Sequence, residues 1–125
     1  MPPALAELQA RLAGFPGAEL THPFGPLPDV YKVGGKVFAM LVDAPEGTRL
    51  TLKCDPFLAE ILRQAHPAVR PGYHTDKRHW NTVHLDQPLP QDVLRNMIEA
   101  SYELVRGSLT KRAQAALSRP GEGAT

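Results

Sequence analysis

Hydrophobic residues recur along this chain with two different spacings, and these spacings predict where helices and strands lie. An apolar residue at every third or fourth position, the spacing of one helix face, runs through residues 3–13, 56–66 and 90–105. Asp55-Pro56 predicts the start of the second helix, because aspartate caps helix N-termini and proline suits the first helical position. A further short helix is expected after Ser108.

Two β-rich runs, residues 30–33 and 36–42, are separated only by Gly34-Gly35. Glycine adopts positive φ without strain, so this pair predicts a two-residue hairpin turn. Residues 48–54 then alternate between apolar and polar side chains, as a strand with one buried face does. With a turn at residues 43–47, these segments predict a meander of three antiparallel strands. Further extended segments are expected at residues 19–22, 69–74 and 79–85.

The order of the expected elements is helix, strands, helix, strands, helix. This order predicts an α+β fold in which one antiparallel sheet has helices packed on one face, as a layered α/β sandwich. The other face of such a sheet is left to solvent or to a ligand. At 125 residues the chain fits one domain, expected over residues 1–118, with a flexible C-terminal tail at residues 119–125.

The composition limits where in the cell the protein is expected and which class of partner it is expected to bind. Hydrophobic residues make up 42% of the chain, and no apolar run approaches the roughly 18 residues that span a bilayer. The sequence lacks the features of a signal peptide and has a single cysteine, Cys54, so a cytoplasmic protein without a membrane partner is expected. The formal net charge of +1 is far from that of a dedicated nucleic-acid-binding protein. Any nucleic-acid site is therefore expected to be a local patch.

The stretch of residues 67–86 is the richest in groups that recognise nucleic acids. It contains the only tryptophan of the chain, three of its five histidines and a Lys-Arg pair. Cations bind phosphates, and flat rings stack on bases. The candidate contact residues in this stretch are His74, Lys77, Arg78, His79 and Trp80.

Trp80 has two interpretations. It begins an alternating strand with Thr82 and His84 on the same face, so its indole either lies at the edge of the core with its N–H paired or forms a stacking platform for a base. Lys77 and Arg78 are expected to be solvated in both cases.

A second group of cations lies on the predicted hairpin and on the strand after it. Lys32 and Lys36 flank the glycine turn, and Arg49 and Lys53 share a polar face. These side chains either form a basic sheet face for a phosphate backbone or are solvated charges that keep the sheet soluble. Lys32, Lys36 and Lys53 are therefore further candidate contact residues.

No catalytic residue, metal or cofactor is expected. His79 and His84 are five residues apart, and an odd offset places them on opposite faces of a strand, which disfavours a zinc site. Cys54 shares a face with Leu50 and Leu52, which predicts a buried and inert thiol. The sequence contains no glycine-rich phosphate-binding motif.

Six segments occur in the following order: Pro23-Phe24-Gly25, residues 29–39, Leu52-Lys53-Cys54-Asp55-Pro56, Pro71-Gly72-Tyr73-His74, residues 77–83 and residues 101–105. Together they resemble the MmcQ/YjbR family of small bacterial proteins, over about residues 19–107. The resemblance implies a fold similar to that of bacterial frataxin (CyaY-like), with helices on one side of an antiparallel sheet. It also implies a DNA-binding role through wing-like hairpins, and it brings no catalytic residues.

The sequence therefore predicts a non-enzymatic, monomeric module that binds DNA. The alternative is a protein–protein interaction domain whose open sheet face meets another protein and binds no nucleic acid. Iron handling, which a frataxin-like fold suggests, is disfavoured because the carboxylates are scattered. An enzyme would require a pocket that gathers His74, His79 and a carboxylate such as Asp76 or Asp86.

Overall fold

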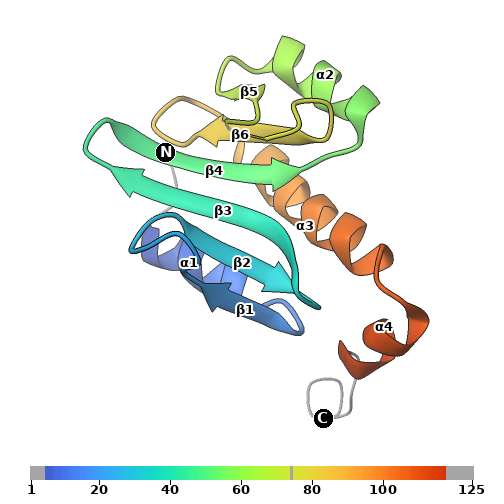
Figure 1. The fold of residues 1–125 in the computed structure, drawn as a ribbon. Coiled ribbons are helices and arrows are strands. Elements are labelled where there is room, and N and C mark those ends of the chain that lie inside the picture. The colour runs from blue at the N-terminus through green and yellow to red at the C-terminus, as the bar shows by residue number, and fades with distance from the viewer. Residues whose placement is uncertain (1–4, 74, 118–125) are drawn as a thin grey trace.

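The computed structural model describes residues 5–73 and 75–117. Within these residues it contains an antiparallel sheet of six strands, in the order β1-β2-β3-β4-β6-β5, and four helices, which confirms the predicted α+β class (Figure 1). The predicted tail at residues 119–125 lies outside the described residues. The elements are α1 (Leu5–Ala13), β1 (Ala18–Thr21), β2 (Asp29–Val33), β3 (Lys36–Ala44), β4 (Gly47–Lys53), α2 (Pro56–Ala65), β5 (Val69–Pro71), β6 (Trp80–His84), α3 (Gln91–Gly107) and α4 (Lys111–Leu117).

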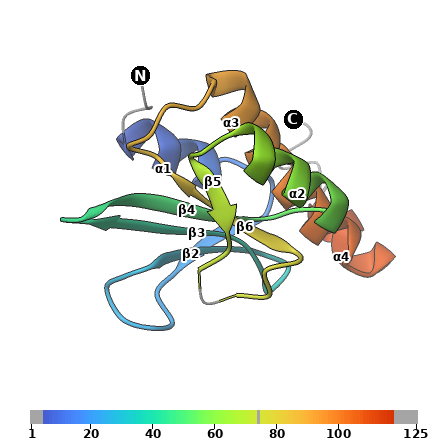
Figure 2. The ribbon, with the colours of Figure 1, turned by 90° about the horizontal axis from the view of Figure 1, so that it is seen from above.

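Helices α1, α2 and α3 lie on one face of the sheet, as Figure 2 shows. On the opposite face the described chain places no helix, and two connecting segments project there instead: residues 22–28 between β1 and β2, and residues 75–79 before β6. In the described part of the chain, no helix has the length and apolar character needed to cross a bilayer. The predicted two-layer arrangement is therefore confirmed, and one sheet face is left open.

The core lies between the sheet and the helices. It is made of apolar side chains from alternate strand positions and from the inner faces of α1 and α3. An aromatic group joins the core to the partly buried Phe15: the rings of Phe15 and Tyr102 stack at 4.5 Å, and Phe38 meets both rings edge-on. The Tyr102 hydroxyl donates a hydrogen bond of 2.6 Å to the carbonyl of Pro16, so this large ring is buried without an unpaired hydroxyl.

The hairpin predicted at Gly34-Gly35 is confirmed. Both glycines have positive φ, 58° and 82°, as a two-residue turn with the right twist requires. The turn predicted at residues 43–47 is wrong in its extent, because β3 and β4 continue to Ala44 and Gly47. Only two residues, Pro45 and Glu46, remain between them.

Strand β3 contains a bulge, because its register with β2 shifts between Tyr31 and Lys32. The last β3–β4 pair at this end is Ala39 with Leu52, so Phe38 and Lys53 do not pair directly. The hydroxyl of Ser101, fully buried on α3, accepts from the Lys53 N–H at 2.8 Å and donates to the Phe38 carbonyl at 2.6 Å. A helix side chain thus replaces the missing sheet hydrogen bonds.

The helix boundaries follow the predicted signals. The Asp55 carboxylate accepts from the N–H groups of Phe57 and Leu58, both at 3.1 Å, as a cap should. Helix α3 extends two residues beyond the predicted Val105, to Gly107. The extended segment predicted at residues 69–74 is shorter as a strand, because β5 ends at Pro71.

Candidate nucleic-acid interface on the open sheet face

The open face is defined here by the strand side chains that point away from the helices. On β4, Leu50 and Leu52 enter the core, so the side chains between and beside them point the other way. Cross-strand partners share a face, which carries this orientation onto β6 and β5. The open-face residues on these strands are polar, charged or aromatic: Arg49, Thr51, Lys53, Arg70, Trp80, Thr82 and His84.

Two cations of the open face lie over aromatic rings. The Lys53 ammonium is 5.9 Å from the centroid of the Trp80 ring, and the Arg49 guanidinium carbon is 5.1 Å from the centroid of the Tyr73 ring. Such pairs are held by attraction between the positive charge and the π-face. The two pairs lie on the same face of β4, one on each side of Thr51.

Hydroxyl groups fix the centre of this face. The hydroxyls of Thr51 and Thr82 lie 2.8 Å apart, and both residues are nearly inaccessible to solvent. The Thr82 hydroxyl also accepts from the N–H of Tyr73 at 3.0 Å. The start of the segment that carries the Tyr73 ring is thereby tied to the sheet.

The segment before β6 is ordered by a short network around Asp76. Its carboxylate lies 2.9 Å from Nδ1 of His79 and accepts from the N–H of Arg78 at 3.0 Å. The hydrogen bond from His79 is the main reason that the pKa of Asp76 lies below its usual value, with the Arg78 N–H next. The Lys77 ammonium donates to the carbonyl of Gly72 at 3.1 Å.

Arg63 on α2 positions the same segment from the helix side. Its Nε donates to the Asn81 side chain at 2.7 Å, and its terminal nitrogen donates to the carbonyls of Lys77 and Trp80. Asn81 is fully buried and also donates to the carbonyl of Ala59 at 3.4 Å. Arg63 therefore holds the backbone at Lys77 and at Trp80, the first and last of the predicted contact residues in this segment.

An apolar groove of about 520 Å³ lies on the open face beside the two cation–ring pairs. Its floor includes Met40, Val42 and Thr51 of β3 and β4, and its walls include Phe24, Arg49 and Tyr73. The Phe24 and Tyr73 rings are 73% and 57% exposed, unlike the buried rings of the core. In this open-face groove, the cation Arg49 lies next to the apolar side chains of Phe24, Met40 and Val42.

Comparisons with known proteins agree on one family. Residues 13–104 match the family model described as YjbR. The chain belongs to the YjbR family. This confirms the resemblance drawn from the sequence segments.

Two relatives and one solved structure are similar to this chain, and two of these three matches extend over nearly the whole chain. YbdF of Escherichia coli O157:H7 is 39% identical over 119 residues, which cover 94% of this chain and 97% of that protein. YjbR of Escherichia coli K12 is 43% identical over 72 residues, which cover 58% of this chain and 61% of that protein. The crystal structure of Deinococcus radiodurans DR2400, a DUF419 domain, is similar with a TM-score of 0.84 and 36% identity, covering 93% of this chain and 88% of that one.

In this YjbR-family chain, the predicted contact residues divide into three groups. Lys53 and Trp80 lie together on the open face, and Lys32 lies on the same face of β2, opposite Val37 of β3. Lys77, Arg78 and His79 lie in the adjoining segment. Lys36 stands apart, because its ammonium approaches the Ser108 hydroxyl after α3 at 3.5 Å. His74 lies outside the described residues.

Trp80 falls between its two predicted interpretations. It is half-buried, so it is neither a fully enclosed core residue nor a freely exposed platform. Its neighbour Lys53 covers part of the ring, and a Cβ on Gly72 would lie 2.7 Å from the Trp80 Cβ. Gly72 thus lies close to the base of the Trp80 side chain, and part of this side chain stays open to solvent.

Three contributors to the site were missed from the sequence as contact residues. Phe24 stands in the turn-rich run Pro23-Phe24-Gly25-Pro26, and an aromatic residue between turn formers was a usable signal of an exposed ring. Arg70 on β5 joins the basic area through its pairing with Thr82. Arg63 had no signal, because nothing in a helix sequence shows which distant carbonyls its arginine reaches.

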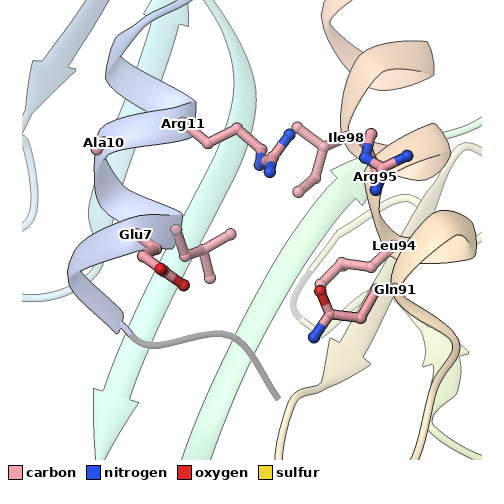
Figure 3. A pocket seen from close by; sticks show the side chains of 8 residues that line it. Glu7, Ala10, Arg11, Gln91, Leu94, Arg95 and Ile98 are labelled. Carbon is pink, nitrogen blue, oxygen red and sulfur yellow. The ribbon is translucent and has the colours of Figure 1, made fainter. Parts of the chain in front are cut away.

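A second groove of about 560 Å³ lies on the helix layer between α1 and α3 (Figure 3). Arg11 reaches from α1 toward α3, where Arg95 and Gln91 line the opposite side. Glu7 and Arg11 lie one helical turn apart on α1, but the ion pairs formed by the described residues do not include this pair. Neither of these two grooves is lined by the histidine and aspartate set that the enzyme alternative requires.

Possible ligands for a metal do not converge in the described part of the chain, where no three His, Cys, Asp or Glu side chains form a cluster. Cys54 is buried, as predicted, with 6% of its surface exposed. Burial, and then the negative charge of Asp55, raise the pKa of its thiol. A raised pKa disfavours the thiolate that nucleophilic chemistry needs.

Proposed function

We propose that this protein is a non-enzymatic, cytoplasmic binding module whose open sheet face binds DNA. The observation that carries the proposal is the pair of cation–ring contacts, Lys53 with Trp80 and Arg49 with Tyr73, on the same face of β4. Proteins that bind nucleic acids combine these two kinds of group, since cations neutralise phosphates and rings stack on bases.

The charges around these pairs favour an anionic partner. Arg70 and Lys32 extend the basic area to both sides, on β5 and β2. Among the described residues, Arg49 forms an ion pair with Glu46 at 3.9 Å, and a surface pair of that length is weak. A phosphate can therefore bind Arg49 in place of Glu46, because little stabilising energy is lost when this ion pair breaks.

The experiment is fluorescence anisotropy with labelled DNA at several salt concentrations. Each phosphate neutralised contributes about −0.9 to the slope of log affinity against log salt for duplex, and about −0.7 for single strands. The double substitution Lys53→Gln with Arg70→Gln should therefore reduce the slope by about one to two units and weaken binding at low salt.

The matched control is Lys111→Gln with Arg112→Gln on α4. It removes one lysine and one arginine, as the test variant does, from a helix that supplies none of the open-face strand side chains. Its slope should equal that of the unmodified protein. Equal losses in both variants, or no binding to duplex or single-stranded DNA at low salt, would contradict the proposal.

One observation favours a second candidate, a protein–protein interaction domain. Helix α2 exposes three apolar side chains on its outer side: Phe57 is 77% exposed, Leu58 41% and Ile61 46%. Apolar residues gathered on one exposed surface are characteristic of protein interfaces. A chain that binds neither DNA probe, and whose Phe57→Ser variant loses a partner recovered by cross-linking, would support this candidate instead.

A further inference from the structure

The open-face groove has the features of a site for a flat ring. Its volume of about 520 Å³ lies within the range of ligand sites, about 300–1,000 Å³. The exposed ring of Phe24 stands on one side, and Arg49 with its stacked Tyr73 stands on the other. Between them, Met40 and Val42 form an apolar floor.

The elements that build the groove are held in place from two directions. Tyr73 is bound through its N–H to the Thr82 hydroxyl, and Arg49 and Thr51 belong to the central strand β4. On the other side, the Thr21 hydroxyl donates to the Val30 carbonyl at 2.9 Å, and His22 contacts Asp29 at 2.8 Å. These two contacts close the base of the segment that carries Phe24.

We propose that this groove binds one unstacked nucleobase of a single strand, while the neighbouring cations hold the phosphates on either side of it. This inference rests on the proposed function, and it adds that the DNA bound is single-stranded. A base in a duplex already stacks on both faces and is paired along its edge, so it cannot enter the groove without being extruded. A base in a single strand is free to leave its neighbours and to stack on an exposed ring.

The charges around the groove favour this occupant over an uncharged apolar one. Arg49 forms part of the wall, and Lys53 lies two positions further along the same face of β4. A single strand has one phosphate on each side of every base, so a base in the groove brings phosphates to these cations. Stacking tolerates every base, and the apolar floor offers few groups for reading base edges, so binding is weakly dependent on sequence.

The first arm of the test compares three probes of equal length: a single strand, its duplex, and the same single strand with abasic sites in place of its bases. The abasic strand has the full phosphate charge and no rings. The single strand should bind about tenfold more tightly than the abasic strand, in line with one stacked base. It should also bind more tightly than the duplex at the same salt concentration.

The second arm uses Phe24→Ala, with Phe57→Ala as the matched control. Both phenylalanines are highly exposed, at 73% and 77%, so neither substitution should change the thermal unfolding midpoint. Phe24→Ala should weaken single-strand binding about tenfold and leave abasic-strand binding unchanged. Phe57→Ala lies on α2, on the opposite face of the sheet, and should change neither.

The outcomes separate this inference from the proposed function. Equal affinity for the normal and abasic strands would overturn the base site while leaving phosphate binding by the open face intact. An unchanged affinity in Phe24→Ala would overturn it as well. No binding to any of the three probes at low salt would overturn both and direct attention to a protein partner.

Discussion

The two faces of this sheet differ in what fills them, although they share the same strands. On β4, Leu50 and Leu52 are fully enclosed beneath the helices, while Arg49 and Lys53 of the same strand remain accessible on the open face. On the covered face the buried rings of Phe38 and Tyr102 meet edge-on, and on the open face Arg49 lies over the exposed ring of Tyr73. Strand alternation has therefore separated the residues that stabilise the fold from those available for binding.

The largest expected effect is on the covered face. Phe38 is fully buried and meets the rings of Phe15 and Tyr102, so Phe38→Ala should lower the free energy of unfolding by about 3–5 kcal/mol. Phe24→Ala makes the same chemical change on the open side and should alter it by less than about 0.5 kcal/mol. Urea unfolding of both variants measures the difference. Similar losses would show that the segment carrying Phe24 is part of the core.

The second largest effect is expected at the β3 bulge, where Ser101 of α3 bonds to the strand backbone. Ser101→Ala removes the hydroxyl that pairs with both the Lys53 N–H and the Phe38 carbonyl. An unpaired buried polar group costs about 1–3 kcal/mol, so the loss should be about 2–3 kcal/mol. Ser108→Ala is the control, because that hydroxyl also donates to a backbone carbonyl, of Val105, but lies at an exposed position. A loss equal to that of the control would mean that the bulge does not depend on Ser101.

The sequence predicted those parts of the fold that depend on neighbouring residues. The Gly34-Gly35 turn, the Asp55 cap and the alternation of β4 are local patterns, and each is present in the structure. The bulge was not predictable, because it depends on a contact between Phe38 and Ser101, which are 63 positions apart. Ser101 appeared in the sequence only as one more member of a helix face.

The candidate site was predictable in part for the same reason. Trp80 and Lys53 were identified from residue type and alternation, and the β4–β6 pairing brings them into contact. Lys36 was grouped with them because it flanks the hairpin turn, but it approaches Ser108 instead. The groove depends on the position of Phe24 relative to Tyr73, 49 residues along the chain, and no local pattern encodes that distance.

The smallest expected effect is the pH dependence that His84 brings to the open face. Burial lowers the pKa of His84 from its usual value of 6.5, and the positive charge of Arg70 lowers it further. Asp86 acts in the opposite direction, and Arg49 adds a small decrease. His84 therefore remains neutral in the folded protein at pH values where the unfolded chain has already taken up a proton.

The sign of the effect follows from proton binding. As the pH falls below 6.5, the unfolded state binds more protons than the folded state, so the free energy of unfolding decreases. The decrease stops once the pH is below the folded pKa, because both states are then protonated. His84→Gln should flatten the pH dependence of urea unfolding in this window. Arg70→Gln should raise the pKa of His84, measured by NMR titration of its ring. The substitution removes the positive charge that, after burial, lowers this pKa most. A folded pKa at or above 6.5 in the unmodified protein would show that His84 is not shielded by the strands beside it.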